Sequence, residues 1–440
     1  MKNPLLKKQN SDLTDSKSRI FIWTLFDFAN TSYSIVVVTF IFAVYFKQHI
    51  LQGESIGDFY WSIGTSVSML ITAIISPILG AVADHSAGKK RFLLGFTLLC
   101  IVSTSLLYYV GVGDVFWALL LFITANIGFE AGLVFYDSFL PEITKPKNYG
   151  RVSGYGFAMG YIGSFVALAL SLPFIKNEMI KETFPLAALF FLVFSLPVFL
   201  FLKEKRKVTS EKISFFEIGF SRVAYTIKNL KNYKNLGLFL LAFFFYIEGV
   251  NTVIYFSGNY ASTTLNFSME DLIYFFIIVQ TTAVIGSVSF GLLSDSIGQK
   301  KSISISLVVW IITIVFAYQT SSTDTYITKT LATWFDTTPE SMIKICFYLV
   351  GLIVGSVMGA TQSTSRSLMS KLTPPEKKTE FFGFYSFFGK SSAILGPLVF
   401  GLVSYAFDSQ RLAILTICIF FIVGLVILHF VQEPELAEEN

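Results

Sequence analysis

Long apolar blocks follow one another along almost the whole chain, and this pattern restricts the fold more than any other feature. A helix that crosses a lipid bilayer needs about 20 predominantly apolar residues. Only 14% of the residues are charged, whereas soluble domains carry about a quarter. We therefore predict an all-α membrane protein with twelve transmembrane helices. The predicted spans are 20–46, 58–83, 92–111, 115–140, 152–175, 184–202, 236–260, 271–294, 302–320, 343–370, 381–405 and 410–431.

The positions of the basic residues predict which side of the membrane each loop faces. If the first residues are cytoplasmic, the loops on that side hold 25 of the 33 Lys and Arg residues, and the opposite loops hold 6. Cytoplasmic loops of membrane proteins carry such an excess. We therefore expect both termini in the cytoplasm, and a plasma-membrane or bacterial inner-membrane location. The first apolar block is too long for the core of a cleaved signal peptide and should remain as the first span.

Three local patterns recur in the second half of the chain. They are an acid followed by Asn and Thr, a pair of glycines six residues apart, and a loop with Gly, Asp, Gly and a basic cluster. A duplicated six-helix unit explains all three recurrences, and parallel repeats of this kind build many transporters. The copies are Asp27, Asn30, Thr31 with Glu248, Asn251, Thr252; Gly154, Gly160 with Gly383, Gly389; and Gly80, Asp84, Gly88, Lys89 with Gly291, Asp295, Gly298, Lys300.

The duplication divides the chain into an N-terminal half, 20–202, and a C-terminal half, 235–431, with a tail at 1–19 and an acidic tail at 432–440. The basic linker, 203–234, has apolar residues on one face of a helix, which predicts an amphipathic helix on the membrane surface. A solvated linker is the alternative. A second short surface helix is expected within 320–341. The apolar positions of the linker are Ile213, Phe216, Phe220, Val223, Ile227 and Leu230.

The paired loop pattern resembles the loop signature of the major facilitator superfamily, although its first copy has one extra residue between Asp84 and Gly88. Three segments resemble more narrowly the vacuole-effluxer-like branch of that superfamily. They read FDFANTSYS in span 1, FYDSFLPEI at the end of span 4 and GRVSGYGFAMGYIGS in span 5. The resemblance implies two pseudo-symmetric six-helix halves and a transport function. Members of the branch are associated with amino-acid export.

Ionisable and polar residues inside the predicted spans are candidates for a substrate or proton cavity. A charged side chain at mid-bilayer depth costs at least ~2.5–3.5 kcal/mol on insertion scales, so each needs a partner, a cavity or a function. The pseudo-symmetry is expected to place the polar stripes of spans 1 and 7 opposite each other. The candidates are Asp27, Asn30, Thr31, Asn126, Glu130, Glu248, Asn251, Thr252, Tyr255 and Lys390.

Glu130 and Glu248 allow two interpretations. Burial disfavours the charged form of a carboxyl group, so either residue is a candidate to take up and release a proton as the carrier changes state. Alternatively, one of them pairs with Lys390 and holds helices together. Lys390 is also a candidate to bind the carboxylate of an amino acid or another organic anion. The Asn and Thr residues fit interhelical hydrogen bonds equally well.

The resemblance further implies charge clusters at the cytoplasmic mouth that hold the outward-facing state. On this basis we expect Asp84, Asp137 and Arg91 to cluster in one half, and Asp295 to pair with Arg366 in the other. Topology-setting charge alone would explain the basic residues but not these acids, because acids contribute little to orientation.

Several function classes lack sequence support. There is no Walker-type phosphate loop, and the three His and three Cys residues are scattered without metal-ligand spacing. We expect no cofactor, no metal and no enzymatic activity. Basic residues are spread over many loops, so no nucleic-acid partner is predicted.

The predicted function is secondary active transport of a small solute, an amino acid or another zwitterionic or amphipathic metabolite. Rocker-switch alternating access between the two halves is the expected mechanism, with export as the direction and with proton coupling as one option. The expected partners are the solute and the bilayer, and the expected state is a monomer. An uncoupled facilitative exporter is one alternative, and a membrane receptor or scaffold on a carrier fold is another.

Overall fold

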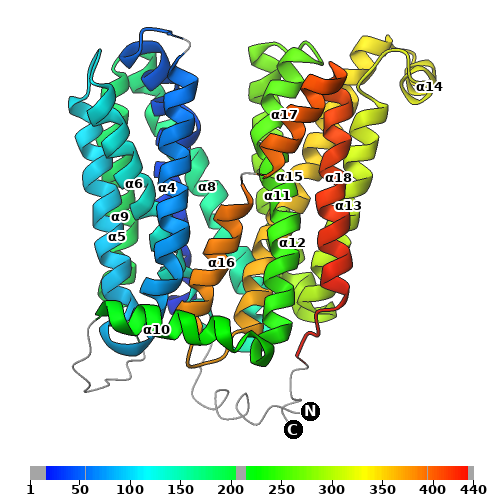
Figure 1. Cartoon of the computed structure of the whole chain (residues 1–440). Coiled ribbons are helices and arrows are strands. Elements are labelled where there is room, and N and C mark those ends of the chain that lie inside the picture. The colour runs from blue at the N-terminus through cyan, green and yellow to red at the C-terminus, as the bar shows by residue number, and fades with distance from the viewer. Residues whose placement is uncertain (1–15, 55, 205–214, 394, 435–440) are drawn as a thin grey trace.

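A computed structural model describes residues 16–54, 56–204, 215–393 and 395–434, and these residues form helices and their connections. They contain twelve helical spans that are long and apolar enough to cross a membrane. The predicted fold class, an all-α membrane protein with twelve spans, is confirmed. The helices stand side by side in two groups (Figure 1).

The first group contains the spans of the N-terminal part. Its first span changes from α-helix to two π-helical segments, η1 and η2, around the short α3. Its helices are α2 (Lys17–Tyr33), η1 (Ser34–Thr39), α3 (Ile41–Tyr45), η2 (Phe46–Ile50), α4 (Ile56–Val82), α5 (Lys89–Leu106), α6 (Val115–Asp137), α7 (Leu140–Ile143), α8 (Tyr149–Lys176) and α9 (Thr183–Phe201).

The second group contains the spans of the C-terminal part. The eleventh span of the chain is divided into two separate helices, α16 and α17 (Figure 1). Its helices are α11 (Lys234–Thr263), α12 (Met269–Ile297), α13 (Gln299–Gln319), α14 (Tyr326–Trp334), α15 (Pro339–Leu372), α16 (Lys378–Ser392), α17 (Leu395–Phe407) and α18 (Gln410–His429).

Two short helices identify the two ends of the bundle. Helix α10 (Phe215–Lys228) lies across one end, which we call the linker face, and α2 begins and α18 ends there (Figure 1). Helix α14 lies at the opposite end, which we call the α14 face. Of the six apolar positions predicted for the linker helix, Ile213 and the side chains of Phe216 and Leu230 lie outside the described residues.

Small residues bring the two groups close together at two pseudo-symmetric crossings. At one, Gly154 of α8 packs against Ser287 and Gly291 of α12; at the other, Gly383 of α16 packs against Ser76 and Pro77 of α4. A Cβ atom at either glycine would collide with the backbone of the neighbouring helix. Close approach of this kind is what small residues permit in membrane helices. One glycine of each repeated pair, Gly154 and Gly383, therefore lies at a contact between the halves.

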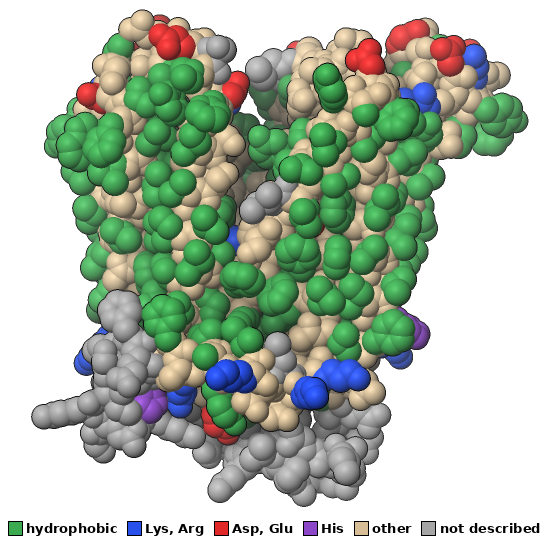
Figure 2. Space-filling view, viewed as in Figure 1, with side chains coloured by type: hydrophobic (Ala, Val, Ile, Leu, Met, Phe, Trp, Pro, Cys, Tyr) green, Lys and Arg blue, Asp and Glu red, His purple; other side chains and the backbone are tan. Residues whose placement is uncertain are grey.

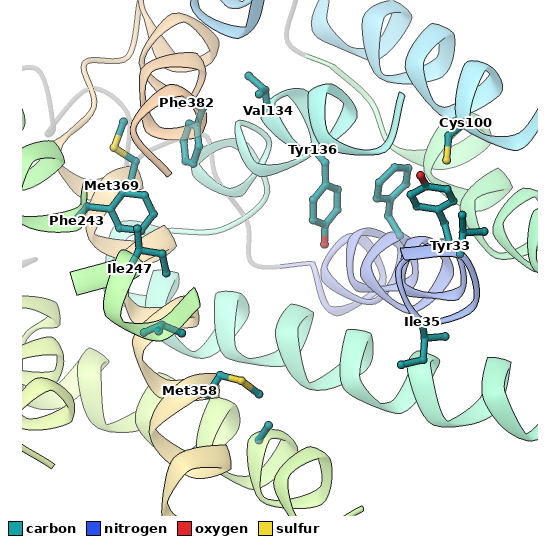
Figure 3. Close-up of a cluster of buried hydrophobic side chains, with 14 of the residues drawn as sticks. Tyr33, Ile35, Cys100, Val134, Tyr136, Phe243, Ile247, Met358, Met369 and Phe382 are labelled. Atoms are coloured by element: carbon teal, nitrogen blue, oxygen red, sulfur yellow. The ribbon is translucent and has the colours of Figure 1, made fainter. Parts of the chain in front are cut away.

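The buried core continues from one group into the other. Its largest cluster of buried side chains contains Tyr33 and Tyr136 from the first group, and Phe243, Met369 and Phe382 from the second (Figure 3). Figure 2 shows that hydrophobic side chains cover the sides of the bundle, and that a hollow between the two groups opens toward the α14 face. The halves are thus joined toward the linker face and separated toward the α14 face.

Candidate functional site

Arg366 is the centre of a buried charge cluster between the halves. It lies on α15 and is 2% exposed. Its Nη1 atom donates to Asp137 Oδ1 at 2.9 Å and to Asp27 Oδ2 at 3.1 Å. Both carboxylates belong to the first group, on α6 and α2, so one arginine connects three helices across the two halves.

Ser153 accepts two further hydrogen bonds from Arg366. Nε donates to the Ser153 hydroxyl and Nη2 to the Ser153 carbonyl, each at 2.9 Å. The guanidinium carbon lies 4.8 Å from the ring of Trp23 and 4.3 Å from the ring of Phe157. A buried charge is tolerable only with such pairing, and the loss of one partner typically costs about 3–5 kcal/mol. We call Arg366, Asp27, Asp137 and Ser153 the arginine cluster.

Two aromatic residues position the acids of the arginine cluster. Trp23 Nε1 donates to the Tyr136 carbonyl at 3.2 Å, and the Tyr136 hydroxyl donates to the Trp23 carbonyl at 3.1 Å. Their rings stack at a centroid distance of 4.6 Å. Because Asp27 lies one turn after Trp23 and Asp137 follows Tyr136, this pair fixes α2 and α6 so that both carboxylates point at Arg366.

The acids of the two repeated loops bind helix N-termini of the opposite half. Asp84 accepts hydrogen bonds from the backbone amides of Thr379, at 3.1 Å, and Glu380, at 2.8 Å, at the start of α16. Asp295 accepts from the amides of Gly150 and Arg151 at the start of α8 and pairs with the Arg151 side chain at 2.7 Å. Carboxylates are stabilised at this end of the helix dipole.

The predicted partners of these gating charges were therefore wrong. Asp84 does not cluster with Asp137 and Arg91, and Asp295 does not pair with Arg366. Arg91 lies exposed on α5. The physical reason is that each loop acid meets the unsatisfied amides of a helix end in the opposite half, whereas Asp137 points into the arginine cluster. Asp27, which was placed in the cavity, belongs to that cluster too.

A second ion pair joins the halves nearer to mid-depth. Glu130 of α6 pairs with Lys390 of α16, and the Lys390 side chain is 25% exposed. The neighbouring Asn126 forms a hydrogen bond within the first group instead: its Nδ2 atom donates to the Ser68 hydroxyl at 2.8 Å. Of the two carboxylates considered as partners for Lys390, the structure selects Glu130.

Glu248 is fully buried on α11 and has a different environment. Its Oε1 atom accepts hydrogen bonds from the backbone amide of Gly396, in the first turn of α17, and from the Thr252 hydroxyl. Its Oε2 atom has no hydrogen-bond partner among the described residues. Glu248 therefore caps the second helix of the divided span, and it forms no ion pair with another residue of the described part of the chain.

The remaining cavity candidates differ in burial and in their hydrogen-bond partners. On α11, Asn251 is half-buried and Tyr255 is 72% exposed, whereas Glu248 is fully buried. On α2, Thr31 donates to the Phe28 carbonyl of its own helix at 3.1 Å, and the buried Asn30 Nδ2 atom has no partner among the described residues. The predicted equivalence of the two stripes was wrong for Asp27 and Glu248, since only Asp27 meets an arginine.

Several residues of this region were missed by the sequence analysis. Glu142 pairs with Lys89 at 2.8 Å and lies 3.9 Å from Lys378 of the other half. The Tyr161 hydroxyl donates to Gln362 Oε1 at 3.0 Å, again across the halves. Glu142 could have been selected from the sequence, because it belongs to the FYDSFLPEI segment that carried the family resemblance. Gln362 could have been selected because it precedes Arg366 by one helical turn.

The described residues contain no group of three or more His, Cys, Asp or Glu side chains that could hold a metal ion. The site instead consists of charged contacts between the two halves, and these contacts can break when the halves move apart. Such contacts are suited to a change in how the halves meet, since each can form in one state and break in another.

Comparison with known proteins agrees with this arrangement. The model of the family described as "Vacuole effluxer Atg22 like" matches residues 59–439. An uncharacterized MFS-type transporter, YxiO of Bacillus subtilis (strain 168), is 32% identical and covers 93% of this chain and 94% of its own. Autophagy-related protein 22 of Kluyveromyces lactis is 24% identical and covers 83% of this chain and 77% of its own.

Solved structures support the same fold. The proton:xylose symporter XylE has a TM-score of 0.72 at 14% identity and covers 95% of this chain and 96% of its own. The human organic anion transporter MFSD10 has a TM-score of 0.71 at 15% identity, and the match covers 94% of this chain and 99% of MFSD10. These likenesses show the fold alone. The predicted resemblance is confirmed: the chain belongs to the Atg22-like vacuole effluxer family and is a membrane transporter of the major facilitator type.

Proposed function

We propose that the protein is a secondary active transporter that moves a small zwitterionic solute by alternating access. The observation that carries this proposal is the ion pair between Lys390 and Glu130, two opposite charges contributed by the two halves near mid-depth. With a quarter of its side chain exposed, Lys390 is accessible to a solute in a way that Arg366, at 3% side-chain exposure, is not.

A zwitterion fits this pair by exchange. The ammonium group of Lys390 is a pure hydrogen-bond donor and the carboxylate of Glu130 a pure acceptor. A solute that carries both a carboxylate and an ammonium group can replace each residue's partner without leaving a charge unpaired. A highly anionic solute would need additional cations, and Arg366 is already saturated by two carboxylates and Ser153. An amino acid is therefore the favoured solute class.

The charged contacts near the linker face support alternating access. Opening that face requires Arg366 to leave Asp27 and Asp137, and requires Asp84 and Asp295 to leave the helix ends they bind. These groups become solvated as they separate, and their new hydrogen bonds to water offset part of the free energy needed to break the contacts. We assign the linker face to the cytoplasm, because 25 of the 33 Lys and Arg residues lie in loops on that side.

Glu248 is our candidate for proton coupling. It is buried, it caps α17, and its second oxygen has no partner among the described residues. Protonation removes the negative charge at the N-terminus of α17 and weakens the cap. A proton on Glu248 would thereby loosen α17 in one state of the carrier. The family description as effluxers supports export as the direction.

The testing experiment measures thermal unfolding of the detergent-purified protein with amino acids, dipeptides, nucleosides, sugars and lysolipids at two pH values. A ligand of the native state must stabilise it. We expect a zwitterion to raise the Tm of the parent chain and to lose this effect in Lys390→Gln. Glu248→Gln should keep the ligand effect but lose its pH dependence.

Each part of the proposal has its own contrary outcome. Equal stabilisation of the parent chain and Lys390→Gln would remove the ion pair from the solute site. An unchanged pH dependence in Glu248→Gln, together with flux in proteoliposomes that ignores a pH gradient, would favour an uncoupled facilitative exporter. Ligand binding without flux would favour a receptor or scaffold.

A further inference from the structure

Helix α10 presents three distinct faces. Gly219 and Thr226, seven residues apart, are buried against the bundle. Phe220 and Ile227 form the next face and are 58% and 51% exposed. Lys228, one position further around the helix, is exposed on the third face. Positions seven residues apart lie on the same side of a helix, so the three faces are buried, apolar and polar in turn.

The buried face of α10 touches both halves of the molecule. A Cβ atom at Gly219 would lie 2.7 Å from Ile78 and 3.1 Å from Val82 of α4, so the two helices pack closely there. At the other end, the Thr226 hydroxyl donates to Glu380 of α16. Lys377 Nζ donates to Thr226 at 2.6 Å and lies 3.5 Å from Glu380. Helix α10 therefore connects α4 with α16 at the linker face.

The exposed apolar face continues the hydrophobic side of the bundle. Leu70 and Ile74 of α4, the helix on which α10 packs, are 58% and 53% exposed among the hydrophobic side chains of that surface. Phe220 and Ile227 extend this surface to the linker face. An apolar stripe in this position, between a membrane-facing surface and a polar face, is typical of a helix that lies in the interface of a bilayer.

Basic residues accompany the apolar stripe. Lys228 ends α10, and Lys231 and Lys234 follow it; all three are exposed. Figure 2 shows Lys and Arg side chains gathered along the lower edge of the molecule, where Figure 1 places α10. Exposed lysines beside a membrane-inserted helix face are complementary to anionic headgroups.

We propose that α10, with Lys228, Lys231 and Lys234, binds the headgroups of anionic phospholipids while Phe220 and Ile227 enter the acyl boundary. Bound in this way, the helix ties the membrane surface to the junction of α4 and α16. That junction must separate when the linker face opens, so anionic lipid stabilises the state in which this face is closed. The proposal is independent of the solute that the carrier moves.

Binding is tested by thermal unfolding of the full chain in a neutral detergent, titrated with phosphatidylglycerol, phosphatidylcholine or soluble glycerol phosphate. Phosphatidylglycerol should raise the Tm, because it binds the native state. The triple variant Lys228→Gln, Lys231→Gln, Lys234→Gln should need a roughly 100-fold higher concentration of phosphatidylglycerol to reach half of the Tm increase. This factor follows from a loss of about fivefold in affinity for each charge removed. The matched control Lys17→Gln, Arg19→Gln, Lys301→Gln changes three exposed charges elsewhere and should respond as the parent chain does.

Three outcomes overturn the proposal: an equal loss in both triple variants, an equal effect of phosphatidylcholine, or full stabilisation by glycerol phosphate alone, which would identify a simple phosphate site.

A second measurement does not depend on charge. In bilayers with brominated acyl chains, Phe220→Trp should add fluorescence that bromine quenches, whereas Lys228→Trp should add fluorescence that is much less quenched. Equal quenching of the two, or none at Phe220→Trp, contradicts insertion of the apolar face.

Discussion

Two of the charged contacts between the halves, the arginine cluster and the Lys390–Glu130 pair, differ in how completely they are satisfied. Arg366 donates four hydrogen bonds to three residues of the other half and stacks among aromatic rings. Lys390 has one acidic partner, Glu130, and is partly exposed. A saturated buried charge resists exchange with a small molecule, whereas a partly exposed one-to-one pair permits it. We therefore propose that the arginine cluster acts in gating and that the Lys390–Glu130 pair binds the solute.

The largest expected effect comes from Arg366→Ala. It leaves Asp27 and Asp137 buried without their cation, so we expect a loss of about 3–5 kcal/mol in the free energy of unfolding. Thermal or denaturant unfolding measures this loss. As a control, Arg411→Ala removes an arginine whose hydrogen bonds within the described residues go to Tyr318 and Ser321 of its own half. If Arg411→Ala is as destabilising as Arg366→Ala, the cluster has no special role between the halves.

A smaller effect is expected from Gly156→Ala. A Cβ atom at Gly156 would lie 2.5 Å from Asp27 Oδ2 and 2.6 Å from Arg366 Nη2, so it must displace the ion pair. Overpacking of this kind typically costs about 1–3 kcal/mol. The matched control is Gly95→Ala on α5, where a Cβ atom meets nothing within 4 Å and helix propensity favours alanine. Spin labels on α4 and α16 should report a more open linker face in the first variant only.

The sequence predicted the fold well because its signals are local. Span length, charge asymmetry and repeated loop motifs are each read from neighbouring residues, and the twelve spans and the family followed from them. The divided eleventh span was not predicted. No proline lies between Ser392 and Leu395, and the division is accompanied by a contact with Glu248, which is 148 residues away from Gly396.

The site was predicted only in part because its partners are distant in sequence. The pairing of Lys390 with Glu130 was one of the predicted alternatives, but the partners of Asp27, Asp137 and Arg366 were not predicted. Arg366 and Asp27 are 339 positions apart, and no local pattern says which carboxylate an arginine meets. The pseudo-symmetry was also misleading, since it equated Asp27 with Glu248 although the halves have diverged at these positions.

A double-mutant cycle on Lys390 and Glu130 sharpens the contrast with the arginine cluster. Each single change, Lys390→Gln or Glu130→Gln, should lower the free energy of unfolding by about 1–2 kcal/mol, and the double variant should recover part of it as a coupling energy of about 1 kcal/mol. Solute binding should be lost in all three. A coupling energy near zero would show that the pair contributes nothing to the closed linker face.

The smallest effect is expected from Glu142→Gln, which lies closer to the linker face than either pair. Lys89 loses its carboxylate partner but keeps the Ser138 carbonyl at 2.8 Å and the ring of Phe139 at 4.4 Å. Lys378, at 3.9 Å, loses only a long contact. Because the buried Lys89 keeps these two partners, and the amide oxygen of glutamine can still accept its hydrogen bond, we expect a loss of only about 1 kcal/mol in the free energy of unfolding, measured by thermal or denaturant unfolding. A loss as large as that of Arg366→Ala would mean that the gate depends on several equal layers of charge rather than on one saturated arginine.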